Sequence, residues 1–175
     1  MQDSFYEQFV GAHESTSYKV VKIIMRVSIV FAILYLFSGV ILGVMGLILS
    51  VLCAIIYFSM IMLKRKIYID YEYDFTNGEI DIVSIGDKIK RKKIIGFDIK
   101  NVELLAPKDS DEIKSVSNKP DRVLKCYPKE TNEKIYTAIL TGGVSRAQIE
   151  FVPNKEFLNL CFQKNPRAVK KDFFR

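Results

Sequence analysis

The stretch VSIVFAILYLFSGVILGVMGLILSVLCAIIYFSMIML, residues 27–63, contains no charged residue and decides how the rest of the chain is organised. Its 37 residues would form a helix roughly 55 Å long, because an α-helix rises about 1.5 Å per residue. The hydrocarbon core of a bilayer is only about 30 Å thick and is crossed by about 20 apolar residues. The run therefore predicts two membrane-spanning helices joined by a tight turn.

A signal peptide or a soluble core would fit this run less well. A secretory signal peptide has an apolar region of about 7–15 residues followed by a small-residue cleavage site. This run is longer, and the basic sequence Lys64-Arg65-Lys66 follows it. A buried helical hairpin of a soluble protein is the second alternative, but soluble cores rarely extend this far without a charge.

Glycines in the middle of the run predict where the two helices meet. Gly43 and Gly46 bracket the expected turn, and helices are expected at about 24–42 and 47–63. Gly39 and Gly43 also form a G-x-x-x-G pattern, which allows two helices to approach closely. Packing within the hairpin is the simpler interpretation of this pattern. Formation of a homo-oligomer through the transmembrane helices is the alternative.

The charges that flank the run predict its orientation. Three basic residues precede the first span, three follow the second, and the turn carries none: Lys19, Lys22, Arg26, Lys64, Arg65 and Lys66. Basic residues in short flanks remain on the cytoplasmic side of a membrane. The sequence thus predicts a multi-pass protein of the cell membrane, with two spans and both termini in the cytoplasm.

Four segments follow from this division of the 175 residues: an arm (1–18), the transmembrane hairpin (19–66), a β domain (67–165) and a basic, aromatic tail (166–175). Within the arm, Phe5, Tyr6, Phe9 and Val10 could share one face of a short helix. The spacing of the three cysteines is not that of a disulfide framework, which favours free thiols in a reducing compartment.

The period of the apolar residues changes to two after residue 66, which predicts a half-buried strand over 67–76. Asn77-Gly78 predicts a type I′ hairpin turn, and Gly86-Asp87 predicts a second two-residue turn. These turns separate the first strand from two more, at 79–85 and 88–95. Four further stretches, 97–105, 122–127, 134–141 and 145–152, bring the number of expected strands to about seven, and Gly142-Gly143 joins the last two. A polar loop is expected over 108–120.

One helix is expected after the last strand. Asn154 can cap its N-terminus, and Phe157, Leu158, Cys161 and Phe162 would then share one face. The predicted fold class is an α-helical transmembrane hairpin followed by a mainly antiparallel β domain that a C-terminal helix completes.

This order of elements resembles the pleckstrin-homology fold, in which a four-stranded and a three-stranded antiparallel sheet are closed by a C-terminal helix. The hairpins at 77–78, 86–87 and 142–143 and the helix at 155–164 carry the resemblance. The whole chain is also similar to small, uncharacterised bacterial membrane proteins in which two transmembrane helices precede a pleckstrin-homology-like domain. The stretch Asp70-Tyr71-Glu72-Tyr73-Asp74-Phe75-Thr76-Asn77-Gly78 is typical of that group. The resemblance implies no catalytic residue.

Basic and aromatic residues outside the apolar run are the candidate contacts with anionic lipid head groups or with a protein partner. They are Lys64, Arg65, Lys66, Arg91, Lys93, Arg167, Lys170, Lys171, Phe173 and Phe174. Two-residue turns would place Asp70, Glu72, Asp74 and Asp81 beside Lys88, Lys90 and Lys92 on one roughly neutral sheet face. Arg91 and Lys93 would then point toward the core, or reach past the edge of the sheet.

The sequence offers no constellation for catalysis, for a cofactor or for a metal ion. His13 is the single histidine, so no nucleophile has a histidine base beside it. The simplest interpretation of Asp70, Glu72 and Asp74 is a solvated face of one strand rather than a metal site. Cys126 and Cys161 are expected to be small residues of the core. Nucleic-acid binding is not expected, because the aromatic side chains of the first strand alternate onto the face that is expected to be buried, where they cannot stack on bases.

We therefore expect a membrane-anchored, non-enzymatic interaction module at the cytoplasmic leaflet that binds a protein partner or anionic lipid. A structural accessory subunit of a larger membrane complex is the alternative function.

Overall fold

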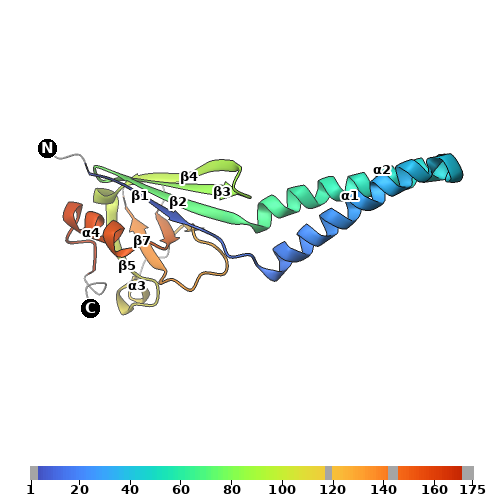
Figure 1. Ribbon diagram of the computed structural model, residues 1–175. Coiled ribbons are helices and arrows are strands. Elements are labelled where there is room, and N and C mark those ends of the chain that lie inside the picture. Colours follow the sequence, from blue (N-terminus) through green and yellow to red (C-terminus); the bar gives the residue numbers. More distant parts are fainter. Residues whose placement is uncertain (1–3, 117–119, 142–145, 171–175) are drawn as a thin grey trace. The chain divides into compact units, whose positions relative to one another are not determined.

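The computed structural model describes residues 4–116, 120–141 and 146–170, and these form two compact units. The hairpin unit comprises residues 13–69 and 86–90, and the β unit comprises the described residues of 1–12, 70–85 and 91–175. The predicted arm of residues 1–18 is thus divided: its part up to residue 12 belongs to the β unit, and residues 13–18 belong to the hairpin unit. Figure 1 labels the elements of both units.

The hairpin unit consists of α1 (Thr16–Leu42) and α2 (Val44–Ile67). Ser15 caps α1 by accepting a hydrogen bond from the Tyr18 amide, as an N-cap residue should. The two helices have mean hydropathies of 2.3 and 2.5, and only 17% and 6% of their most apolar stretches are buried within the protein. Helices of this length and composition can cross a membrane. Their exposed apolar surfaces distinguish them from the core helices of a soluble protein.

The connection between the two helices is shorter than the predicted four-residue turn. Gly43 alone separates them, with a φ of 57° and a ψ of −136°, a combination that only glycine adopts without strain. Gly46, expected in the turn, lies instead in the first turn of α2. Both helices extend beyond the predicted spans at their charged ends, because the helical backbone continues past the apolar residues.

The first sheet of the β unit contains β1 (Phe5–Val10), β2 (Ile69–Thr76), β3 (Glu79–Gly86) and β4 (Lys90–Asp98), in the order β1-β2-β3-β4. The prediction of a short helix in the arm is wrong, because residues 5–10 pair with β2 as an antiparallel strand. Tyr6, Gln8 and Val10 face the core opposite Phe75, Tyr73 and Tyr71. The period of two in these residues is typical of a strand, which the helical interpretation overlooked.

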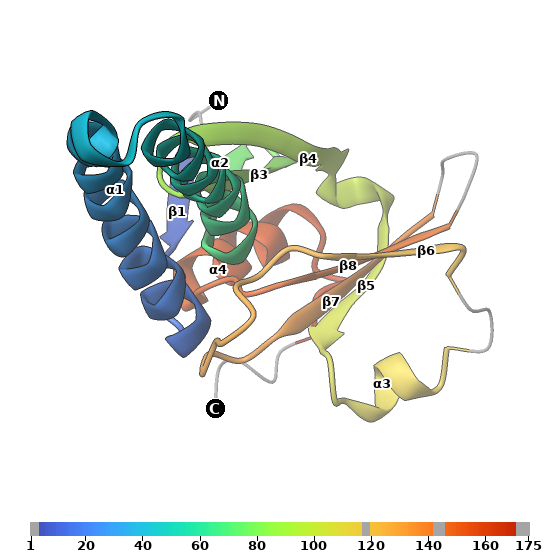
Figure 2. The same ribbon diagram turned by 90° about the vertical axis from the view of Figure 1, so that its right-hand side faces the viewer.

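The second sheet has the order β5-β7-β8-β6, shown in Figure 2. It comprises β5 (Val102–Pro107), β6 (Arg122–Lys125), β7 (Tyr136–Leu140) and β8 (Ala147–Phe151). The described strands thus form two sheets of four rather than one of four and one of three. This sheet is also mixed, because β6 runs parallel to β8. The short helices η1 (Ile99–Asn101) and α3 (Asp111–Lys114) lie between strands, α3 within the predicted loop.

The C-terminal helix α4 (Lys155–Lys164) has the predicted bounds. The side chain of Asn154 accepts a hydrogen bond from the Phe157 amide, which confirms the predicted N-cap. Phe157 is fully buried and its ring meets those of Tyr6, Tyr73, Phe75 and Phe151. This aromatic cluster joins the helix to strands of both sheets and forms the centre of the core.

One predicted turn is confirmed and another is displaced. Asn77 and Gly78 have φ angles of 54° and 109°, as a type I′ turn requires. At the next hairpin, β3 ends at Gly86 and β4 begins at Lys90, so three residues connect them instead of two. Asp87 and Lys88 take the positive φ angles there, 49° and 60°. The predicted turn at Gly142-Gly143 lies outside the described residues.

Candidate functional site

The side chains of Arg91 and Lys93 do not have the direction that the predicted turn at Gly86-Asp87 required. Side chains alternate between the two faces of a strand, so a shift of one residue exchanges the faces. Arg91 makes an ion pair with Glu72, and the Lys93 ammonium lies 2.6 Å from a carboxylate oxygen of Asp81. Both basic side chains therefore lie on the solvent side of the sheet, and the prediction that they point toward the core is wrong.

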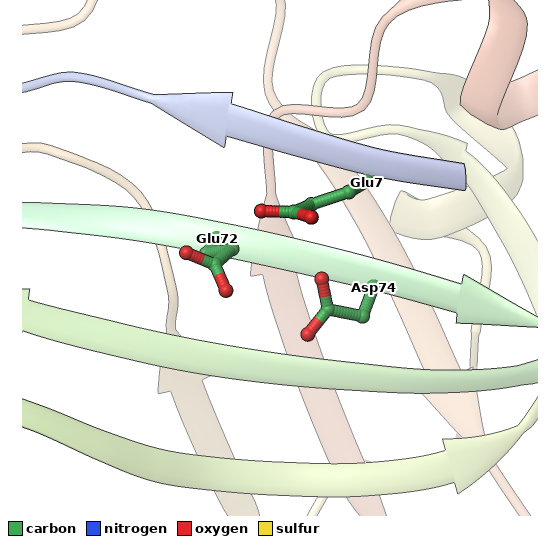
Figure 3. Close-up of side chains that lie close together, drawn as sticks. All are labelled: Glu7, Glu72 and Asp74. Atoms are coloured by element: carbon green, nitrogen blue, oxygen red, sulfur yellow. The ribbon is translucent and has the colours of Figure 1, made fainter. Parts of the chain in front are cut away.

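On this side of the sheet, three carboxylates from two adjacent strands lie close together. The prediction of a solvated strand face is wrong for two of its members, because Asp70 and Glu72 are buried, with exposed fractions of 1% and 5%. Glu7 of β1 is opposite Asp74 of β2, with Glu72 two residues away, and their oxygens lie within 4.8 Å of one another (Figure 3). Burial raises the pKa of Asp74 above its usual value, and the charges of Glu72, Glu7 and Asp81 raise it further. Arg91 neutralises only one of the three carboxylates, so this group, the acidic face, attracts cations and basic groups.

Sequence reasoning identified Glu72 and Asp74 but missed Glu7. A helical arm has no neighbouring strand, so the helix prediction gave Glu7 no partner. The alternation of Phe5, Glu7 and Phe9 with Tyr6, Gln8 and Val10 is the signal that could have identified a strand here, although it does not say with which strand it pairs.

Two tyrosines and three lysines form a second group, within the hairpin unit, where the helices begin and end. The rings of Tyr18 and Tyr68 are 4.7 Å apart. Lys22 lies 4.5 Å and Lys64 5.7 Å from the centre of the Tyr18 ring, and Lys88 lies 5.8 Å from that of Tyr68. Tyrosine and lysine are the residues that membrane proteins place at the lipid–water interface.

Asp87 holds this second group together. Its carboxylate accepts a hydrogen bond from the Tyr18 hydroxyl at 3.2 Å and pairs with the Lys64 ammonium at 2.9 Å. Lys64, a predicted lipid contact, therefore has an acidic partner within its own unit. Arg65 and Lys66 are exposed, as a contact with lipid head groups requires.

Net charge is divided unequally between the two units. By sequence, the hairpin unit carries eight Lys and Arg residues and two acids, Glu14 and Asp87, a net charge of +6. The β unit carries 18 basic and 18 acidic residues and is neutral. The whole excess positive charge of the chain thus belongs to the unit that holds the two apolar helices.

The beginning of the predicted tail packs on the β unit. Ala168 and Val169 are buried, and the backbones of Ala168 and Lys170 bond to Leu105 of β5. Arg167 is exposed and Lys170 is half-buried. Lys171, Phe173 and Phe174 lie outside the described residues.

The glycines predicted to pack helices lie in the hairpin itself. A side chain on Gly39 would meet Leu47 of α2, and Gly46 of α2 lies against the backbone of Gly39. Gly43 forms the connection. The close approach is thus between α1 and α2, which is the simpler of the two interpretations.

Neither Cys126 nor Cys161 is an activated thiol. Cys126 and Cys161 are buried, and burial raises the pKa of each to about 12, so both stay protonated at neutral pH. A protonated thiol is neither a strong nucleophile nor a metal ligand. Both pack as small apolar residues, the role expected from the sequence.

Comparison with known proteins gives one match. Residues 2–171 match the model of a family described as bacterial PH-like domain (DUF6106). Searches of curated proteins and of solved structures found no match. The matched region includes the arm with β1, both apolar helices, both sheets and α4, so it spans nearly the whole chain. On this evidence the chain belongs to the bacterial PH-like domain family.

Proposed function

We propose that the chain is a membrane-anchored interaction module at the cytoplasmic leaflet, whose hairpin unit contacts anionic lipid while its β unit binds a protein partner. The division of charge supports this proposal most directly, because the hairpin unit has a net charge of +6 and the β unit has a net charge of zero. A basic residue near an anionic membrane surface contributes about 1 kcal/mol of attraction. The exposed residues Lys19, Arg65 and Lys66 are the strongest candidates for this contact.

The β unit is a weaker candidate for lipid binding. Arg91 and Lys93, two of the predicted contacts, already pair with acids of their own sheet. The acidic face beside them would repel anionic head groups. These observations favour a protein as the ligand of the β unit.

Orientation is tested by labelling in intact cells. In a variant with its native cysteines replaced by serine, a cysteine at Met45 should react with a membrane-impermeant maleimide. A cysteine at Glu130, an exposed residue of the β unit, should react only after the cells are opened. Labelling of position 130 in intact cells would show the opposite topology.

Lipid binding is tested with the full chain in a zwitterionic detergent. Phosphatidylglycerol should raise its melting temperature more than phosphatidylcholine does, and the difference should shrink as salt screens the charges. The triple variant Lys19→Gln, Arg65→Gln, Lys66→Gln should lose most of the difference.

A matched control removes the same charge from the β unit, with Lys100→Gln, Lys129→Gln and Lys155→Gln, all at exposed positions. This variant should retain the preference for phosphatidylglycerol. If the wild-type chain shows no preference even at low salt, or the control loses as much as the test variant, the lipid part of the proposal fails.

A further inference from the structure

The strand β1 lies at an edge of the first sheet, and the charge of Glu7 is the only feature of its sequence that protects that edge. Natural proteins prevent the pairing of exposed edges with lysines, prolines, bulges or covering segments. The six residues of β1, FYEQFV, include no lysine, proline or glycine, and they pair with β2 without a register shift. A weakly protected edge of this kind is a template for an additional strand.

The other edges of the described sheets each carry such protection. β4, at the opposite edge of the same sheet, begins with Lys90-Arg91-Lys92-Lys93. The edge of β5 is occupied, because Leu105 exchanges backbone hydrogen bonds with Ala168 and Lys170. β6 is only four residues long and has a basic residue at each end. Among the edge strands that the structure describes, β1 alone has no lysine, arginine, proline or covering segment.

The hydrogen-bond pattern identifies which residues of β1 face outward. The Asn77 amide donates to the Ser4 carbonyl at 2.9 Å, so Ser4 is a hydrogen-bonded partner of β2. Such pairs alternate along an antiparallel ladder. The backbone groups of Phe5, Glu7 and Phe9 therefore point away from β2, toward the open edge.

The side chains of the same three residues give this edge its chemical character. Phe5 and Phe9 are 67% and 58% exposed, although phenylalanine is usually buried. Glu7 lies between them and is opposite Asp74, within the acidic face. Two exposed rings around an excess of negative charge would suit an added strand that carries basic side chains between apolar ones.

We propose that β1 binds a basic, extended segment of a partner protein, which adds to the first sheet as a fifth strand. Backbone hydrogen bonds with Phe5, Glu7 and Phe9 would provide affinity, and side-chain contacts with the acidic face would provide specificity. A second copy of this chain is a poorer occupant, since antiparallel pairing of two β1 strands about Glu7 sets one Glu7 against the other. Anionic lipid is poorer still, because the face is acidic.

The probe is a synthetic peptide that alternates lysine with valine, added to the full chain in zwitterionic detergent, where no anionic lipid competes for it. We expect saturable binding by calorimetry. A peptide with glutamate in place of lysine should bind at least about tenfold more weakly. A peptide whose backbone amides are methylated on one edge should lose binding, because it cannot extend the ladder.

Two variants of Glu7 separate charge from edge pairing. Glu7→Gln removes the charge and keeps the outward amide, so it should weaken binding several-fold. Glu7→Pro also removes that amide, which β2 does not use, and should abolish binding while the near-ultraviolet circular dichroism of the core stays unchanged.

Three results would overturn the proposal. The first is no binding of the lysine peptide to the folded wild-type chain, and the second is equal binding by the Glu7→Pro variant. The third is a dimeric wild-type chain that Glu7→Pro converts to a monomer, since this would assign the edge to self-association.

Discussion

Replacing Phe157 with alanine should lower the free energy of unfolding of the β unit by about 3–5 kcal/mol, the usual cost of removing a buried phenylalanine. The ring of Phe157 is fully buried, and its centre lies 5.9 Å from that of Phe75 and 6.1 Å from that of Phe151 in edge-to-face geometry. Its loss leaves a cavity at the point where α4 meets both sheets. Near-ultraviolet circular dichroism of the full chain in detergent, followed through chemical denaturation, measures the change.

Phe5→Ala is the matched control, because it makes the same chemical change at a position that is 67% exposed. It should alter stability by less than about 0.5 kcal/mol, as surface substitutions usually do. Equal losses in the two variants would contradict the placement of Phe157 at the centre of the core.

Replacing Gly46 with valine should separate the two apolar helices, α1 and α2, near their connection. A Cβ atom at Gly46 would lie 3.0 Å from the Gly39 Cα and 3.1 Å from the Tyr35 carbonyl oxygen, and backbone atoms cannot rotate away. Overpacking of this kind costs about 1–3 kcal/mol. The Ser50 hydroxyl donates to the Ala32 carbonyl at 2.9 Å, so cysteines at positions 32 and 50 report the approach of the helices. Their disulfide yield, measured by intact-mass spectrometry after mild oxidation in a Cys53→Ser background, should fall several-fold.

Gly39→Val provides the comparison for this substitution. A Cβ atom at Gly39 would lie 3.7 Å from the Leu47 side chain, an ordinary contact with a flexible group. The disulfide yield should stay near that of the parent. A Gly46→Val variant that cross-links as well as the Gly39→Val variant would show that the helices do not meet through Gly46.

The sequence alone determined the features that depend on local chemistry. The uncharged run of 27–63 specified two helices because no single span or soluble core accommodates it. Asn77-Gly78 specified a tight turn, and Asn154 specified the start of α4, because each signal acts within a few residues of the backbone that it shapes. These features can be predicted because the energies that fix them involve near neighbours in the chain.

Tertiary structure decided the features that depend on long-range pairing. FYEQFV can form one face of a helix or both faces of a strand, and it becomes β1 because β2 supplies its hydrogen bonds and Val152 and Asn154 bind its Gln8 side chain. Arg91 and Lys93 lie on the same side of the sheet as the acidic face, where they pair with Glu72 and Asp81. A strand exchanges faces at every residue, so an error of one residue in the predicted register was enough to place them on the core side. The acidic face and its open edge exist only because residues 5–9 pair with residues 72–76, although both apolar helices lie between these two segments in the sequence. No local pattern encodes a pairing across that distance, so only the folded chain brings this surface together.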